Sequence, residues 1–366
     1  MTIKKWAGAF MALYISMSGR AKKYHEVTKP KGWWVMLSDH LRWLCREREF
    51  NHYYFSQGLD AKGADISDYL GRRTMDKYRK SYSGLVCGKQ GGGKVDPCEI
   101  LVKDKFYCSS ILKCGGFAVP DTLFLITDGA IHPLSEAGSV AGLADGEYFL
   151  KNTMMESGSG VYRFSVSHGT ILTGDGMPGD EVIKEMTRNG RWIIQPKLRS
   201  HPVISAVNDT ALNTTRIFTL VTVNGIEYAG GYQAFATGDS VTDSWQHGSV
   251  YVSIDPPRNR LGRLGITSQS DPRKGLLCEH PDSKIVFAGY EIPFLEKSVD
   301  VCLRAHSLFE GALIIGWDIA ITSDGPVILE ANENPGINVL QSLEGGIRKR
   351  IRNSCRELKR RYYDQG

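Results

Sequence analysis

The sequence lacks the features that define several common classes of protein. None of its eight cysteines forms a Cys-x-x-Cys pair, and no Cys/His group has the spacing of zinc ligands. Lys and Arg (45) outnumber Asp and Glu (40) only slightly, and no block of one sign dominates, so nothing specific predicts nucleic-acid binding. The composition, 42% hydrophobic and 23% charged, excludes disordered and fibrous chains. A soluble globular protein with reduced thiols is expected.

The N-terminus has the outline of a signal peptide. Lys4-Lys5 precede an apolar run, Trp6–Met17, that is too short to span a bilayer as a helix. The basic segment Gly19–Lys23 follows at once and disfavours export. An amphipathic or buried helix fits as well, and peripheral membrane contact through residues 1–25 stays open. The predicted location is cytoplasmic.

The 366 residues suffice for two or three lobes around a cleft. Strands and helices are intermixed with hairpin-like strand pairs, which predicts an α+β fold rather than a doubly wound sheet. We expect a mostly helical N-terminal region (1–100), a lobe with a glycine-rich loop (101–198) and a C-terminal lobe (199–366). Predicted helices are Asp104–Gly115, Glu181–Asn189, Pro293–Phe309 and a long final helix, and the Gly/Ser/Asp-rich stretch after Ala236 is predicted to be irregular.

A run resembling a phosphate-binding P-loop is incomplete. Gly88–Lys94 matches the first seven positions of that motif, but Val95 stands where a Ser or Thr would hold magnesium. No strand clearly precedes the run. It is interpreted as a loop or linker.

Oxygen-bearing side chains gather in one predicted hairpin near the C-terminus. Asp318 lies in an apolar strand, and Glu330 and Asn332 end the next, with an Asp324-Gly325 turn between them. Residues two apart on a strand face the same side, so these three side chains could hold Mg²⁺ together with nucleotide phosphates. The alternative is a strand-end acid satisfied by an Arg or by backbone. Asn334-Pro335-Gly336 follows, and a Pro-Gly turn exposes backbone N–H groups to an anion.

These motifs together resemble the ATP-grasp superfamily. The resemblance extends backwards in order through Asp104-Lys105, Glu147–Lys151, Glu156–Val161, Trp192–Leu198 and Asn213–Arg216. It implies two lobes that sandwich ATP, with Lys105 and Lys151 on the phosphates and a mobile loop, Ser157, Gly158, Ser159, Gly160 and Val161, over the triphosphate. It also implies adenine contacts from Gln195, Pro196, Lys197 and Leu198, a nucleotide contact from Asn334, and Arg216 on the transferred phosphoryl group. A structural salt bridge is the alternative for Arg216. His201 would reach the ribose or lie on the surface.

A narrower resemblance is to the sugar-transfer associated ATP-grasp family, over roughly residues 50–345. It is carried by Gln195, His201-Pro202, Asn213–Arg216, the Asp243 to Gly248 stretch, Gly289–Pro293 and Gly316–Glu330. Two stretches depart from the family pattern, Ser244 with His247-Gly248 and the run Glu330–Asn334. Both are expected to face the acceptor, which leaves its identity open.

The resemblance implies an ATP- and Mg²⁺-dependent carboxylate-amine ligase that forms an acyl-phosphate and then an amide. The products could belong to surface polysaccharide biosynthesis, with small-molecule carboxylate and amine substrates. His247 or Asp243 could deprotonate the amine. Alternatives are an ATP-grasp kinase that phosphorylates a small molecule or sugar, and a non-catalytic nucleotide-binding scaffold. The sequence does not indicate an oligomeric state.

Overall fold

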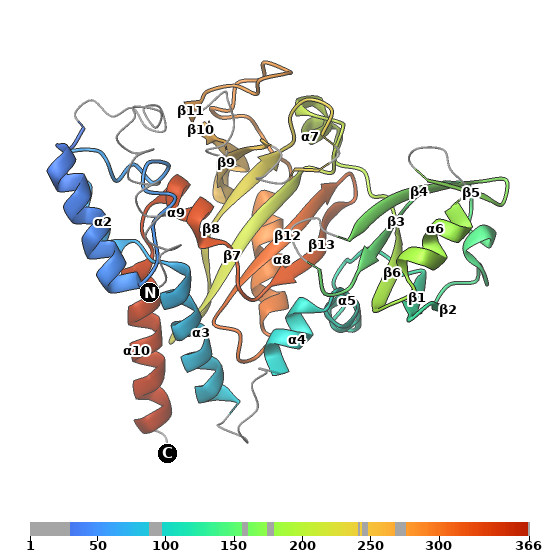
Figure 1. The fold of residues 1–366 in the computed structure, drawn as a ribbon, viewed down its shortest axis with the longest axis horizontal. Helices are drawn as coiled ribbons and strands as arrows, with labels where there is room; N and C mark the ends of the chain where they lie inside the picture. Colours follow the sequence, from blue (N-terminus) through green and yellow to red (C-terminus); the bar gives the residue numbers. More distant parts are fainter. Residues whose placement is uncertain are drawn as a thin grey trace.

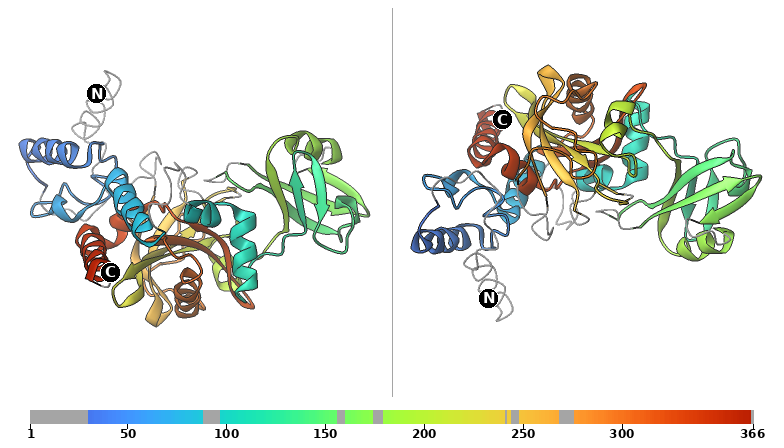
Figure 2. Two further views of the ribbon diagram at one scale, coloured as in Figure 1. Left: turned by 90° about the horizontal axis from the view of Figure 1, so that it is seen from below. Right: turned by 90° about the horizontal axis from the view of Figure 1, so that it is seen from above.

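The computed structural model describes residues 30–87, 97–155, 160–173, 179–240, 242–243, 248–267 and 276–364. They form two antiparallel β-sheets and a group of N- and C-terminal helices, arranged in a row with the second sheet in the middle (Figures 1 and 2). The Gly88–Lys94 run lies outside these ranges. Within them, no helix combines the length and apolar character needed to cross a membrane.

The first sheet has six strands in the order β2-β1-β6-β3-β4-β5, all paired antiparallel. Its strands are β1 (Phe124–Thr127), β2 (Ala130–Pro133), β3 (Gly146–Asn152), β4 (Val161–Ser167), β5 (Thr170–Thr173) and β6 (Arg191–Pro196). In β3, Tyr148 and Leu150 are buried in a core that includes Ile183 of α6 (Gly179–Met186) and Val140 of the short helix η2 (Val140–Gly142). Because side chains alternate along a strand, Phe149 and Lys151 point to the opposite face.

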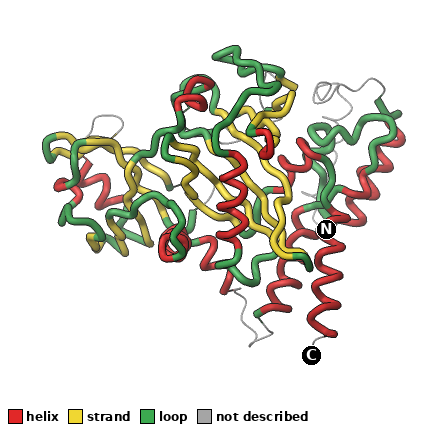
Figure 3. The backbone as a smooth tube through the Cα atoms, turned by 180° about the vertical axis from the view of Figure 1, so that it is seen from behind, coloured by secondary structure: helices red, strands yellow, loops and turns green. Residues whose placement is uncertain are grey.

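The second sheet has seven strands in the order β11-β10-β9-β8-β7-β12-β13. Its strands are β7 (Thr214–Thr222), β8 (Gly225–Phe235), β9 (Val250–Asp255), β10 (Arg260–Ile266), β11 (Leu276–Leu277), β12 (Ile314–Thr322) and β13 (Gly325–Asn332). Helix α8 (Leu295–His306) covers one face of this sheet. Figure 3, which shows the molecule from behind, has this face in front. Ile315, Trp317, Ile319 and Ile321 of β12 belong to the core beneath α8, so Asp318 points to the other face.

Helices complete the core around this sheet. Helices α4 (Pro97–Lys103) and α5 (Lys105–Cys114) pack against β13, although they precede the first sheet in the sequence. The remaining short helices of the described ranges are η1 (Ile66–Asp68), α7 (Pro202–Val207) and η4 (Pro256–Arg258). The second sheet and the helices around it therefore combine segments that precede the first sheet in the sequence with segments that follow it.

The N-terminal region docks on the C-terminal helices. It contains α2 (Trp33–Glu47) and α3 (Arg72–Val86), and the chain ends with α9 (Ile337–Glu344) and α10 (Arg348–Asp364). Leu70, Met75 and Tyr82 share a buried cluster with Leu340 of α9 and Ile351 of α10. The N-terminal region is thereby part of the packed molecule.

Several predicted elements are confirmed and one is wrong. The helix begun by Asp104 and the hairpin of β12 and β13 are present, with boundaries within a few residues of the prediction. The stretch after Ala236 is not irregular throughout, because it contains β9 and β10, and Val250–Ile254 has strand-like alternation. The predicted long final helix is present as α10, and a separate short helix, α9, precedes it. Gly345 has φ +93°, and a Cβ on Gly346 would lie 2.5 Å from the backbone oxygen of Asp68.

Candidate active site

One cavity of about 690 Å³ lies where the first sheet, the second sheet and the N-terminal region meet. Most of the predicted site residues of the described ranges line it. The lining includes Lys105, Lys151, Val161, Gln195, Pro196, Leu198, Arg216, Asp243, Asp318, Glu330, Asn332 and Asn334. Segments more than 200 residues apart in the sequence thus contribute to one space.

The register of four neighbouring strands sets the charged centre of this cavity. Glu330 of β13 is paired with Asp318 of β12, Asp318 with Arg216 of β7, and Arg216 with Tyr232 of β8. Directly opposed residues share a face, so these four side chains form a lateral row. A bulge leaves Leu329 without a partner in β12, and so Glu330 faces the cavity whereas Ile328 faces the core beneath α8.

Arg216 and Asp318 form a buried, two-pronged ion pair. The guanidinium Nε and Nη2 donate to the two carboxylate oxygens at 2.5 and 2.8 Å. Burial raises the pKa of Asp318 to about 7, with the neighbouring Glu330 acting in the same direction and Arg216 opposing. Burial opposes ionisation of Arg216 as well, yet Asp318 keeps the pKa of the guanidinium above its ordinary value. The sequence left open that Asp318 and Arg216 form only a structural ion pair, and the two hydrogen bonds between them agree with that alternative.

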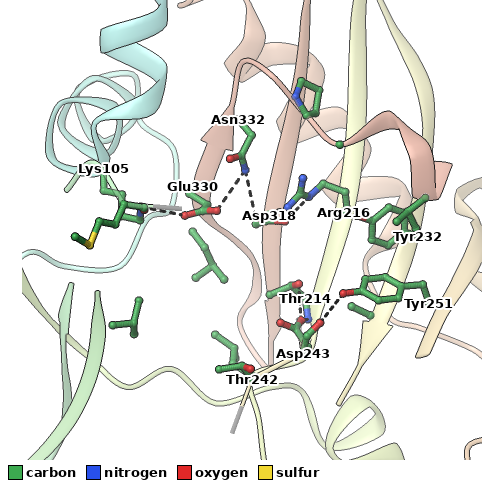
Figure 4. A pocket seen from close by; sticks show the side chains of 18 of the residues that line it. Lys105, Thr214, Arg216, Tyr232, Thr242, Asp243, Tyr251, Asp318, Glu330 and Asn332 are labelled. Atoms are coloured by element: carbon green, nitrogen blue, oxygen red, sulfur yellow. Dashed lines mark hydrogen bonds and ion pairs between the residues drawn. The ribbon is translucent and has the colours of Figure 1, made fainter. Parts of the chain in front are cut away.

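Glu330 and Asn332 extend the row toward α5 (Figure 4). Asn332 Nδ2 lies 3.4 Å from an Asp318 oxygen and 3.3 Å from a Glu330 oxygen, and Lys105 Nζ lies 3.6 Å from the other Glu330 oxygen. Burial opposes ionisation of Glu330, but Lys105 holds the pKa of its carboxyl below the ordinary value. Two crowded carboxylates therefore face the cavity with an amide beside them.

This donor set fits a hard divalent cation. Each carboxylate oxygen has a second lone pair beyond its present contact, and a rotated Asn332 amide would present its oxygen to the same point. Burial, and after it the charge of Glu330, raises the pKa of Asp318, and a nearby divalent cation would favour its ionised form. In the described ranges no three His, Cys, Asp or Glu residues form a metal cluster, so such a site would depend on Asn332 and on ligands from a bound molecule.

The position of Lys105 follows from a helix cap. Asp104 accepts hydrogen bonds from the N–H groups of Phe106 and Tyr107, as an N-cap residue does. The same buried carboxylate accepts from Thr153 Oγ1 at 3.0 Å and pairs with Arg191 at 3.1 Å. One side chain thus joins the start of α5 to the first sheet and fixes Lys105 at the junction.

Lys151 enters the cavity from the first sheet. Its Nζ donates to Gln195 Oε1 at 3.0 Å, across the β3–β6 pair. Burial lowers the pKa of Lys151 to about 8, although Glu330 opposes this shift. Lys151 therefore loses its charge more readily than an exposed lysine, and a bound anion would restore it.

An apolar slot adjoins the two lysines. Its walls come from Pro120, Phe149, Val161, Pro196 and Leu198. Such a slot between the sheets can take a flat ring, with the backbone of the segment after β6 at its edge. Val161 begins β4, and the carbonyl of the preceding Gly160 accepts from the N–H of Asn152.

Two residues predicted to contact nucleotide have their side chains elsewhere. Lys197 Nζ pairs with Glu147 at 2.6 Å, and its side chain is not in the cavity lining. His201 is the N-cap of α7, where Nδ1 accepts from the Val203 N–H at 3.2 Å. Lys197 lies between two lining residues, Pro196 and Leu198, without itself lining the cavity, and the side chain of His201 has a local structural role.

Asp243 lies beside the charged row, next to Thr214, which is two residues before Arg216 on β7 (Figure 4). One of its oxygens accepts from both the N–H and the hydroxyl of Thr214, and Tyr251 donates to its backbone carbonyl. Burial raises its pKa, and the Thr214 bonds oppose the shift. Asp243 is thus an acid held in a fixed position beside Arg216. Ser157, Gly158, Ser159 and His247 lie outside the described residues.

The cavity also has a wall that the motifs did not indicate. Tyr53, Arg72 and Met75 reach it from the N-terminal region, and Gly336–Val339 from the start of α9. Tyr232 and Tyr251 are likewise new; the pKa of each is raised by burial. No motif indicated Arg72. It belongs to an Arg72-Arg73 pair at the start of α3, and nothing in the local sequence distinguishes it from Arg73.

The two antiparallel sheets facing one cavity, with lysines from α5 and β3 and an acidic hairpin opposite, have the architecture of an ATP-grasp protein. A family model described as sugar-transfer associated ATP-grasp matches residues 97–356, and the chain belongs to this family. Among curated proteins, no sequence matches the chain.

Solved structures with similar folds are distant. A D-alanine–D-alanine ligase from Bacillus anthracis in complex with ATP shares 12% identity at a TM-score of 0.42, over 73% of this chain and 69% of that one. A D-cycloserine synthetase, DcsG, shares 15% at 0.40, over 71% and 70%. The ADP complex of an N5-carboxyaminoimidazole ribonucleotide synthetase shares 11% at 0.38, over 65% of this chain. The chain spans only 46% of that synthetase.

Proposed function

We propose that this protein is an ATP- and Mg²⁺-dependent ligase that activates a carboxylate as an acyl-phosphate and couples it to an amine. The observation that carries the proposal is the row Glu330–Asp318–Arg216 at the centre of the cavity, flanked by Lys105 and Lys151. Acids that suit a divalent cation and bases that suit phosphates lie side by side there. Phosphoryl transfer requires this combination of charges.

The roles of the residues follow from their positions. Lys151 and Lys105 would bind nucleotide phosphates, and the slot formed by Phe149, Leu198 and their neighbours would hold the base. Mg²⁺ held by Asp318, Glu330 and Asn332 would neutralise phosphate charge. Arg216 is held in place by Asp318, and its planar group would orient the phosphoryl group as it meets the carboxylate.

Asp243 is the candidate base for the second half-reaction. An amine must lose a proton to displace phosphate, and a carboxylate with a raised pKa accepts that proton more readily than an ordinary one. Thr214 holds this carboxylate in the cavity lining, where it would face the amine. The overall balance is acid plus amine plus ATP, giving amide, ADP and phosphate. Sugar-linked acids or amines of surface polysaccharides are the proposed substrates, from the family description alone.

A paired-substrate screen tests the reaction. Purified protein with MgATP is incubated with panels of sugar acids and amino acids, each with and without amines. We expect release of ADP and phosphate only when both partners are present, together with a product mass equal to acid plus amine minus water. Phosphate retained on a single acceptor would instead identify a kinase. Nucleotide binding without turnover across the panels would favour the scaffold alternative.

A further inference from the structure

The N-terminal region is built into the wall of the active-site cavity. Tyr53 and Arg72 line the cavity, yet both lie outside residues 97–356, which the family model matches. Arg72 is the first residue of α3, and the residue before it, Gly71, provides no side-chain cap. The N–H groups of Gly71 and Arg73 donate to Glu47 and Glu49, so α3 contributes the Arg72 side chain to this end of the cavity.

Buried polar contacts fix this wall in place. Gln341 of α9 accepts from the Leu70 N–H at 2.8 Å and donates to the Leu70 carbonyl at 2.9 Å. Ser56 and Ser342 share a buried hydrogen bond of 3.1 Å. A side-chain amide that satisfies both polar groups of one buried residue is costly to break. Leu70, two residues before Arg72, is thus anchored to α9, and this fixes the backbone that carries Arg72.

Arg72 differs from the other cations of the cavity in having no partner. Lys105 pairs with Glu330, Lys151 donates to Gln195, and Arg216 pairs with Asp318. Arg72 makes no hydrogen bond or ion pair with any residue that the structure describes. Tyr53 and Asn338, at the start of α9, line the same cavity, and the N-cap residue of α9, Gly336, has no side chain to cap the helix. The Arg72 cation, the Tyr53 phenol and the start of α9 in the same lining all favour a negative group.

We propose that Arg72 and Tyr53 form a subsite for an oxyanionic group, a carboxylate or phosphate, on the acceptor substrate. This group is distinct from the carboxylate that is activated, and the inference rests on the proposed function. A guanidinium group binds carboxylate and phosphate alike through paired hydrogen bonds, so the subsite would select a group with two anionic oxygens. ATP already has Lys105, Lys151 and Arg216 on its side of the cavity. The N-terminal region would then select the acceptor while the ATP-grasp lobes perform the phosphoryl transfer.

Matched pairs of probes test the subsite. Binding to protein saturated with Mg²⁺ and a non-hydrolysable ATP analogue is measured by calorimetry. The pairs are L-glutamate and 4-aminobutyrate, D-glucuronate and D-glucose, and glycerol 3-phosphate and glycerol. We expect at least one oxyanionic member to bind and its counterpart lacking that group to bind at least tenfold more weakly. The glutamate and glucuronate arms report a carboxylate, and the glycerol phosphate arm a phosphate.

Two substitutions of Arg72 and one control complete the test. R72A should weaken the preferred oxyanion about 10- to 100-fold, which corresponds to the loss of a charge-assisted, two-pronged contact, and R72K should weaken it less. R73A is the control, because Arg73 is in the same helical turn and is exposed but does not line the cavity. Binding of the ATP analogue should be unchanged in all three.

Three results of the binding measurements would overturn the subsite. They are a wild-type protein that binds the ATP analogue but discriminates no probe pair, an R72A variant that binds the oxyanion as wild type does, and an R72A variant that loses nucleotide affinity instead. Failure of the wild-type protein to bind any nucleotide refutes the proposed function as well. Ligase activity that is indifferent to R72A refutes only the subsite.

Discussion

Asp318→Asn separates the two roles assigned to Asp318, partner of Arg216 and metal ligand. The substitution keeps the shape of the side chain and removes its negative charge. In the folded protein the carboxylate accepts two bonds from Arg216 and lies beside Glu330 in the row across the sheet. The amide can still accept one bond from Arg216, but it cannot offer two anionic oxygens to a cation.

The expected loss of stability is moderate. Breaking a buried ion pair by removing one partner typically costs about 3–5 kcal/mol. Here the remaining Glu330 stays close to Arg216, and ionised Asp318 is itself unfavourable because burial raises its pKa to about 7. Both factors reduce the loss, so we expect the free energy of unfolding without ligand to fall by about 1–3 kcal/mol.

Thermal unfolding with and without MgATP provides the assay. A ligand at one hundred times its dissociation constant stabilises the folded state by about 2.7 kcal/mol, which we expect for the wild type. The Asp318→Asn protein should lose this stabilisation almost completely. Asp39→Asn is the matched control, since Asp39 also pairs with a cation, Lys31 at 2.7 Å, and accepts from Tyr54, but lies outside the cavity lining. It should lower the ligand-free stability and keep the MgATP shift.

The comparison of the two variants decides the matter. A full MgATP shift in Asp318→Asn would refute the metal-ligand role, and with it the central argument for the site. Equal loss of the shift in Asp39→Asn would show that general destabilisation, and not the missing carboxylate, explains the result.

The remaining predictions concern pH. Burial lowers the pKa of Lys151 to about 8, and a neutral amine binds phosphate poorly. The affinity for MgATP should therefore fall as pH rises from 7.5 to 9.5, by up to about tenfold per pH unit. In calorimetry, Lys151→Arg should flatten this profile, and an equally steep profile would contradict the role assigned to Lys151. His306, which hydrogen-bonds Thr219 and the Ala312 carbonyl, has its pKa lowered by burial to about 4. The unfolded chain takes up a proton near pH 6.5 and the folded one near 4, so stability from His306 is complete above pH 6.5 and falls by about 3 kcal/mol as pH drops to 4. Urea unfolding of wild type and His306→Asn should show this slope only in the wild type, and equal slopes would assign it to other groups.

Local patterns predicted the elements that carry the acids and lysines. The helix that begins after Asp104 follows from a capping residue, and the β12–β13 hairpin follows from two apolar strands around a tight turn. Such signals depend on neighbours in the sequence. Asp318 and Glu330 can therefore be placed together from the sequence alone, and the order of the motifs indicates the fold.

Contacts between distant segments were beyond the reach of these patterns. Nothing in the sequence places Arg216 opposite Asp318, because the register of β7 against β12 is fixed by which faces are buried over strands about one hundred residues apart. The Leu329 bulge and the N-cap role of His201 depend in the same way on backbone geometry.

The sequence by itself determined the class of fold, its main elements and the residue types that can handle magnesium and phosphate, since each depends on local periodicity, capping and composition. Only the tertiary structure decided that Glu330, Asp318, Arg216 and Tyr232 form one row. It alone also brought Arg72 and Tyr53 to the cavity, through Gln341 and Leu70. The physical reason is that strand register and domain docking depend on the burial of side chains far apart in the chain, which no local pattern encodes.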